Sequence, residues 1–227
     1  MTDVLHHFLH IGKTGGTALK HAIESAPTSV VSGIRLHNHG VTLAMIPDGE
    51  RVFFTIRDPI DRFLSSFFSR WREGKPRYNV PWTADERIAF GRFDTPNKLA
   101  LALSSGDKEE RTAAEHAMRS IGHIKSSYWD WFVDEAYFDH RAADIAFIAR
   151  QEHLNDDFDT LKRMLGLPTS LRLPKDDISA HRNPRNADRR LDPIANRNLA
   201  AWYARDYAFL KICQEMKATH DTLGALC

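Results

Sequence analysis

Residues 10–17, which read His-Ile-Gly-Lys-Thr-Gly-Gly-Thr, have the composition of an anion-binding turn. Gly15 and Gly16 let the backbone approach a ligand closely or adopt a positive φ, and Lys13 adds a mobile positive charge. If a helix begins here, its first N–H groups and the positive end of its dipole point at the same small volume. The segment therefore predicts a site for an anion such as phosphate; the alternative is an ordinary strand-to-helix turn.

The order of these residues differs from that of a Walker A loop. That loop reads G-x-x-x-x-G-K-[ST], with its lysine after the glycines. Here Lys13 precedes Gly15 and Gly16, and Phe8 occupies the position five residues before the lysine. We therefore expect a phosphate loop of another kind, with a P-loop nucleotide kinase-like phosphotransferase as an alternative.

A second cationic junction follows the β-prone residues 51–56. Asp58 is a good N-cap and Pro59 a good first helical residue, so a helix is expected to begin there. Arg57 has a planar fork of donors that suits a phosphate, and Ser65 offers a hydroxyl further along this helix. The alternative for Arg57 is a structural ion pair with an aspartate.

Two histidines, His37 and His39, lie two residues apart in a segment that is expected to be extended. Their side chains would point the same way, but no nearby Cys, Asp or Glu completes a metal site with convincing spacing, so no metal is predicted. Imidazole titrates near neutral pH and can accept a hydroxyl proton, which makes a catalytic base a candidate role. A polar loop with solvated histidines is the alternative.

Apolar periodicity predicts an α/β chain in a single domain, residues 1–227. We expect a three-layer fold in which helices flank a mostly parallel sheet, with ligand sites at the carboxyl ends of its strands. Strands are expected within residues 4–11, 28–33, 51–56 and 144–150. Helices are expected after residue 17, from residue 59, over 83–93, 96–103, 108–121 and 151–165, and as one long helix over 193–217.

Three further segments carry possible functional side chains. Residues 180–190 hold four arginines against Asp188, and their lack of apolar periodicity predicts a basic loop. Residues 73–81 are predicted to form an exposed loop. Trp129 and Trp131 belong to an aromatic segment that favours core packing, with a wall of an acceptor site as the alternative.

The composition limits the class of protein. A net charge of +1 over 227 residues argues against generic nucleic-acid binding, so any positive field must be local. Cys213 and Cys227 do not suggest a disulfide framework, and we expect a protein of the reducing cytoplasm. No run of about 18 apolar residues occurs, so no integral membrane segment is expected. Nothing in the sequence determines the oligomeric state.

Residues 10–17 and 54–65 together resemble the two signature motifs of the sulfotransferases that use 3′-phosphoadenosine 5′-phosphosulfate (PAPS). Their order and separation are similar to the carbohydrate sulfotransferase branch, especially the uronyl 2-O-sulfotransferases. The resemblance implies a P-loop-NTPase-like sulfotransferase fold and transfer of a sulfuryl group from PAPS, without a metal, to a small-molecule or glycan acceptor. Because no membrane anchor precedes the motifs, it suits a soluble bacterial member. The R-K-G-type loop of the branch acting on phenols and steroids is absent.

The same resemblance assigns roles to individual residues. The 5′-phosphosulfate would be held by Lys13, Thr14, Gly15, Gly16 and Thr17. The 3′-phosphate would be held by Arg57 and Ser65, with His181 and Arg182 approaching the cofactor. Lys13 and His39 would be catalytic, Lys13 by neutralising the departing oxygen and His39 by taking the acceptor proton. A non-catalytic module that binds a nucleotide or polyanion is the alternative outside enzymes.

Overall fold

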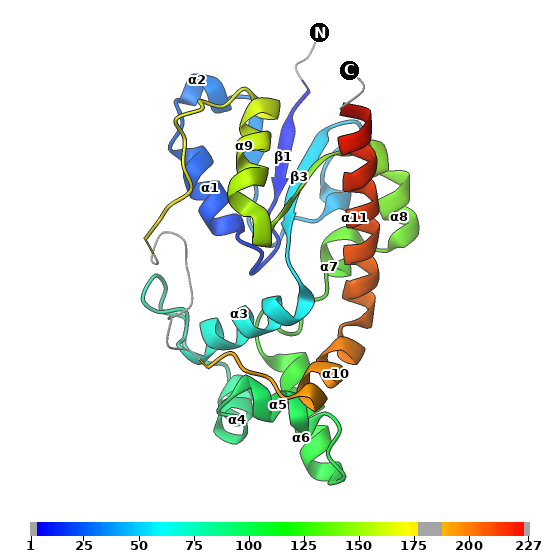
Figure 1. The fold of residues 1–227 in the computed structure, drawn as a ribbon. Helices are drawn as coiled ribbons and strands as arrows, with labels where there is room; N and C mark the ends of the chain where they lie inside the picture. The colour runs from blue at the N-terminus through cyan, green and yellow to red at the C-terminus, as the bar shows by residue number, and fades with distance from the viewer. Residues whose placement is uncertain (1–3, 177–187, 225–227) are drawn as a thin grey trace. The chain divides into compact units, whose positions relative to one another are not determined.

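The computed structural model describes residues 4–176 and 188–224, and the chain forms two compact units. The first unit comprises Met1–Arg57, Tyr128–His181 and Ala208–Cys227, and the second comprises Asp58–Ser127 and Arg182–Tyr207. Figure 1 shows the helices and strands of both. A single domain over residues 1–227 stays a prediction.

A four-stranded sheet in the order β2-β1-β3-β4 is the framework of the first unit. Its strands are β1 (His6–Leu9), β2 (Ile34–Leu36), β3 (Arg51–Ile56) and β4 (Ile145–Arg150). The neighbouring strands all pair in parallel, with His7 opposite Arg35 on one side and Val52 on the other. Because parallel strands end at the same edge, the segments that follow them are brought together there. The predicted α/β fold with a parallel sheet is confirmed.

Helices cover both faces of this sheet, as the expected three layers require. The helices of the first unit are α1 (Gly16–Glu24), α2 (Thr28–Val31), α7 (Trp129–Phe132), α8 (Glu135–His140), α9 (Leu154–Leu165) and most of α11 (Ala204–Gly224). Successive side chains of β3 serve opposite faces. Phe53 joins a buried cluster with Phe158 of α9, whereas the ring of Phe54 lies 4.7 Å from that of Phe132 and 6.3 Å from that of Phe209. Figure 1 accordingly shows α1 and α9 on one side of β3 and α11 on the other.

The expected strand within residues 28–33 is wrong. Residues Thr28–Val31 form the short helix α2, and β2 begins only at Ile34. The N–H of Val30 donates to the carbonyl of Pro27 at 2.9 Å, which closes a helical turn. Val30 and Val31 pack against the buried cluster from this turn, so tertiary packing overrides the β-propensity of the two valines.

The single helix expected over residues 193–217 is also wrong, because the structure has two helices there. Helix α10 (Pro193–Trp202) ends at Tyr203, and α11 begins at Ala204. Tyr203 is buried and its hydroxyl donates to the carbonyl of Ile124 at 3.2 Å. This buried anchor explains why the chain turns between two segments of continuous helical periodicity.

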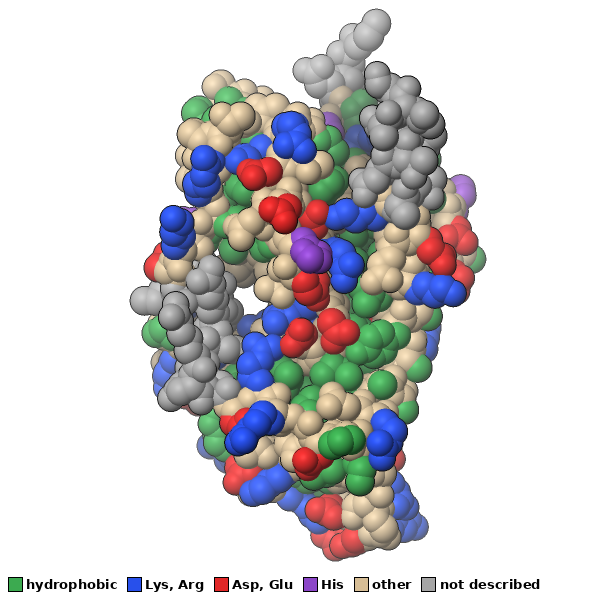
Figure 2. Space-filling model, viewed as in Figure 1, with side chains coloured by type: hydrophobic (Ala, Val, Ile, Leu, Met, Phe, Trp, Pro, Cys, Tyr) green, Lys and Arg blue, Asp and Glu red, His purple; other side chains and the backbone are tan. Residues whose placement is uncertain are grey.

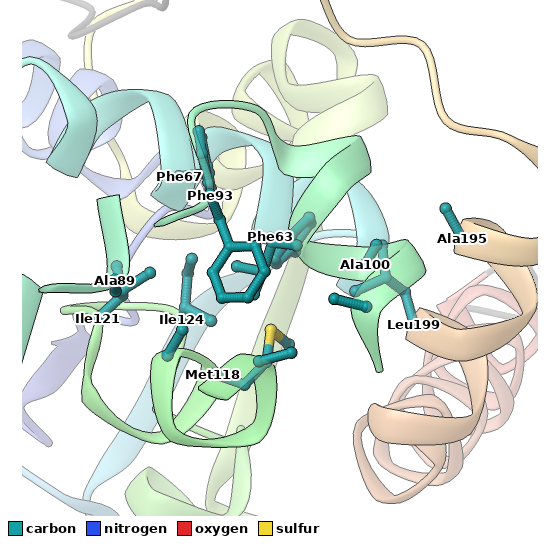
Figure 3. Packing of buried hydrophobic residues seen from close by; sticks show 14 of the residues in the cluster. Phe63, Phe67, Ala89, Phe93, Ala100, Met118, Ile121, Ile124, Ala195 and Leu199 are labelled. Atoms are coloured by element: carbon teal, nitrogen blue, oxygen red, sulfur yellow. The ribbon is translucent and has the colours of Figure 1, made fainter. Parts of the chain in front are cut away.

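The second unit is helical and has its own core. Its helices are α3 (Pro59–Trp71), α4 (Ala84–Arg92), α5 (Pro96–Ala102), α6 (Lys108–Ser120) and α10. Figure 3 shows Phe63 and Phe67 of α3 among side chains from the other helices, including Met118 and Leu199. The predicted helices over 83–93, 96–103 and 108–121 are confirmed to within one residue at each end.

A buried ion pair crosses this helical unit. Arg70 donates two hydrogen bonds to the carboxylate of Glu86, at 2.6 and 2.5 Å, and also binds the carbonyls of Val80 and Pro81 in the loop between α3 and α4. Burial raises the pKa of Glu86, but hydrogen bonds from Arg70 and from two backbone N–H groups outweigh it and hold the pKa at about 2. The ionised carboxylate therefore stabilises the fold above the pKa of an unfolded glutamate, about 4.3, and this stabilisation is lost as the pH falls toward 2.

We expect Glu86→Ala to lower the free energy of unfolding by about 3 to 5 kcal/mol at pH 7, because it leaves Arg70 buried without its counter-ion. Urea denaturation measures the loss. The control is Glu109→Ala, which removes a carboxylate that is 84% exposed and should cost less than about 1 kcal/mol. Equal losses in the two variants would contradict this account.

Candidate active site

The loop between β1 and α1 presents an uncapped helix N-terminus. Lys13 has φ 68° and Gly15 has φ 91°, both in the left-handed region. Gly15 is the N-cap of α1, no side chain caps this helix, and its first turn holds no acidic residue. Because the first N–H groups of a helix have no acceptor within it, the N-terminus of α1 carries an uncompensated positive potential.

The N-terminus of α3 is the opposite case. Asp58 accepts hydrogen bonds from the N–H groups of Ile60 and Asp61, at 2.9 and 3.0 Å, as the sequence predicted for an N-cap. The carboxylate of Asp58 thus compensates this helix end. The positive charge at this second junction comes from the guanidinium of Arg57 rather than from the helix itself.

The two glycines of the loop are required by its packing. A Cβ at Gly16 would lie 2.5 Å from Cδ2 and 2.8 Å from Nε2 of His10, closer than real side chains approach. A Cβ at Gly15 would lie 3.0 Å from Leu154, in a backbone conformation that L-residues rarely adopt. Tight packing therefore explains both glycines without a ligand, and it also holds the N–H groups of the loop in place.

A pair of threonines fastens the loop to the sheet. Thr14 is fully buried and its hydroxyl donates to the carbonyl of Ile11 at 2.9 Å. Its oxygen lies 2.6 Å from the hydroxyl of Thr55 on β3, which must then be the donor because Thr14 has only one hydroxyl proton. The hydroxyl of Thr14 is therefore used inside the protein, and any contact with a ligand falls to its backbone N–H.

The structure brings Arg57 to the loop. Its guanidinium Nη1 donates to the carbonyl of Lys13 at 3.4 Å. The backbone of Arg57 is held by the fully buried Tyr128, whose hydroxyl accepts from the N–H of Arg57 at 3.0 Å and donates to its carbonyl at 2.6 Å. The side chain of Arg57 thus reaches the backbone of Lys13, 44 residues earlier in the sequence.

His39 is held in a defined orientation beside the loop. Its Nδ1 lies 2.9 Å from the carbonyl oxygen of His10. A carbonyl can only accept, so Nδ1 carries the proton and Nε2 is the acceptor nitrogen of the neutral ring. The indole N–H of Trp131 donates to the carbonyl of His39 at 3.0 Å, and the side chain of His39 is on the exposed surface.

His10 contributes packing rather than charge. Burial, together with the nearby His39 and Lys20, lowers the pKa of His10 to about 3, so its ring is neutral at physiological pH. The rings of His10 and His39 lie 4.0 Å apart between centroids. The neutral ring of His10 therefore forms the surface against which His39 rests.

For the other predicted residues, the assigned roles stay predictions. Ser65 is half-buried on α3, in the second unit. His181 and Arg182 lie outside the described residues. Trp129 and Trp131 are only 7% and 6% exposed, which confirms core packing rather than an exposed wall.

Sequence reasoning missed three residues that position the site: Thr55, Tyr128 and Trp131. Tyr128 and Trp131 lie in the aromatic segment for which the sequence predicts only core packing or a wall of an acceptor site. The available signal was chemical, since a buried tyrosine hydroxyl or indole N–H needs a hydrogen-bond partner. That requirement does not say which partner is used.

Positive and negative side chains are mixed on the surface away from the loop. On the face that Figure 2 shows, Lys and Arg side chains are interspersed with Asp and Glu, in keeping with the net charge of +1.

The described residues offer neither a metal site nor a membrane span. Within residues 4–176 and 188–224, no group of three or more His, Cys, Asp and Glu is arranged to hold a metal ion. Every helix in these ranges is too short or too polar to cross a membrane.

A comparison with protein families matches residues 42–211, more than half of the chain, to the model described as the sulfotransferase family. The matched span contains Arg57 and Ser65 and begins after His39, so the loop at residues 10–17 lies outside it. Searches of curated proteins and of solved structures found no match.

We expect Gly16→Ala to lower the free energy of unfolding by about 1 to 3 kcal/mol, because its methyl group must displace the ring of His10. Urea denaturation measures this change. The matched control is Gly33→Ala in the same unit, where a Cβ would meet nothing within 4 Å. If Gly16→Ala were as stable as the control, the loop would not depend on this contact.

Proposed function

The chain belongs to the sulfotransferase family, and from that premise we propose that it transfers a sulfuryl group from PAPS to a hydroxyl or amine by in-line displacement. The observation that carries the proposal is the contact of the Arg57 guanidinium with the backbone of Lys13, in the loop that leads to the uncapped N-terminus of α1. A nucleotide with anionic groups at two positions matches two cations placed beside oriented N–H groups.

The residues of the loop fit the donor. When bound, PAPS supplies the activated sulfuryl group. Lys13 and the backbone N–H groups of residues 14–17 would hold its 5′-phosphosulfate, with Thr14 contributing only its backbone. Arg57 and Ser65 would hold the 3′-phosphate, and the resemblance adds His181 and Arg182 near the nucleotide.

Catalysis would rest on position and electrostatics, as in phosphoryl transfer. The ammonium of Lys13 would oppose the negative charge that develops on the departing phosphate oxygen, and the N–H groups of the loop would bind neighbouring oxygens without reorganising. His39 would accept the acceptor proton at Nε2, the nitrogen that its bond to His10 leaves unprotonated.

The acceptor is proposed from the resemblance alone. The resemblance to the uronyl 2-O-sulfotransferase branch indicates a carbohydrate or glycoconjugate hydroxyl as the acceptor. The same resemblance suits a bacterial member of that branch. A cytoplasmic location also stays a prediction, made from the cysteine content.

We expect Lys13→Ala to lower kcat about 10²- to 10³-fold, the usual loss when one group that stabilises transition-state charge is removed. His39→Gln should lower it about 10²- to 10⁴-fold. Transfer from labelled PAPS to a panel of glycans, phenols and peptide tyrosines measures both. Controls are Lys211→Ala, whose side chain is 76% exposed, and the exposed His21→Gln. Full activity in both site variants would refute these assignments.

We expect 3′-phosphoadenosine 5′-phosphate to bind more tightly than adenosine 5′-phosphate, and Arg57→Ala to remove most of that preference. A hydrogen bond to a charged group contributes about 1.5 to 3 kcal/mol, so the loss should be roughly 10- to 100-fold. Calorimetry with both nucleotides measures it. Arg35→Ala is the control, because that guanidinium binds backbone carbonyls of Ser32 and Ile34. Steep salt dependence without a preference for the 3′-phosphate would instead indicate a polyanion-binding module.

A further inference from the structure

Three titratable side chains form a continuous series across the sheet of the first unit. Nδ1 of His7 lies 2.8 Å from Nε2 of His37, and Nε2 of His7 contacts Oε2 of Glu50. The two imidazole rings are stacked, with centroids 5.0 Å apart. His7 is only 6% exposed, so its two polar contacts are made inside the protein.

The parallel sheet determines the direction of this series. His7 is on β1, Glu50 immediately precedes β3, and His37 immediately follows β2. Glu50 is therefore at the amino edge of the sheet and His37 at the carboxyl edge, two residues before His39. The series connects the edge that carries the proposed site to the opposite edge, where the side chain of Glu50 is 27% exposed.

Each of the two contacts requires one proton between its atoms. Among the described residues, Nε2 of His7 and Oε2 of Glu50 have only each other as polar partners. Because a carboxyl is more acidic than an imidazolium, the proton between them lies on His7 and the carboxylate accepts. In neutral His7, Nδ1 must then accept from Nε2 of His37. This order leaves Nδ1 of His37 as the nitrogen that can take up a proton.

We propose that Glu50, His7 and His37 form a proton-accepting array beside the proposed site, in which a proton from solvent enters at Nδ1 of His37 and its charge is held on His7. A new N–H bond forms at Nδ1 of His37, its Nε2–H bond breaks, and that proton bonds to Nδ1 of His7. The positive charge then resides on His7 beside the carboxylate of Glu50. The reverse steps return the proton to solvent.

Glu50 compensates the positive charge that protonation of the array creates. A buried imidazolium is costly unless an anion pairs with it, and Glu50 is that anion. Among the described residues, the charged groups that act on these histidines include Lys20 on α1 and Arg51 at the start of β3, and Arg35 lies opposite His7 on β2. His6 on β1 and His10, just after β1, are neighbouring titratable groups. Burial, then His7 and Lys20, lower the pKa of His37, so the positive charge is disfavoured on His37 itself.

The proposal rests on the proposed function, but its first test does not require transfer. Long-range ¹H–¹⁵N NMR of the full chain, labelled in histidine, reports which ring nitrogen carries each proton as the pH changes. We expect His37 to carry its proton on Nε2 at pH values above the midpoint of the array's titration. At pH values below this midpoint, His37 should carry its proton on Nδ1, and His7 should become doubly protonated over the same pH range.

Glu50→Gln removes the negative charge but keeps the shape of the side chain. Because the cation then loses its counter-ion, we expect the NMR midpoint to fall by about one pH unit, a tenfold loss of proton affinity. The acidic limb of the kcat profile should move to lower pH by a similar amount. Glu135→Gln, an exposed carboxylate of the same unit on α8, is the control.

Two results would overturn the array: His37 carrying its proton on Nδ1 at every pH, or a midpoint that Glu50→Gln does not move. Either would mean that the three residues only fasten the end of β2 to β1. A normal NMR titration in a chain that transfers sulfuryl to no acceptor would instead overturn the proposed function, and the catalytic role of the array with it.

Discussion

The contact between His10 and Gly16 is the constraint on which the site depends. The ring of His10 occupies the space that any side chain at position 16 would need. The same residue offers its carbonyl to Nδ1 of His39 and its neutral ring to the ring of His39. One residue, His10, thus determines both where the N–H groups of the loop lie, through its ring, and which nitrogen of His39 can accept a proton, through its carbonyl.

The positive potential of the site is local, as the net charge of +1 requires. It comes from a helix end that no side chain caps, together with Lys13 and Arg57. The helix α3, which follows the other cationic junction, is capped by Asp58 and so adds little. Two turns of similar sequence type therefore differ in their electrostatics, because the N–H groups at the start of α3 are capped by Asp58 and no side chain caps those of α1.

Hydrogen bonds from buried side chains fix the positions of Arg57, His39 and Thr14. Tyr128 binds both backbone polar groups of Arg57, Trp131 binds the carbonyl of His39, and Thr55 binds Thr14. Inside a protein such bonds are costly to leave unmade, so they restrict the backbone to one arrangement. The region that binds and positions ligands in our proposal is thereby supported by the core of the first unit, and the Glu50–His7–His37 series extends that support across the sheet.

The sequence by itself determined the features that act over a few residues: the strand-to-helix turns, the cap at Asp58, the glycine loop and the cationic residues beside it. Only the tertiary structure decided which groups meet. The helix at Thr28–Val31, the bond of Tyr128 to Arg57 across 71 residues and that of Trp131 to His39 across 92 residues have no local signature. The reason is physical: caps and turns are satisfied by near neighbours, whereas a buried hydroxyl, indole or imidazole finds its partner only after distant strands and helices have packed.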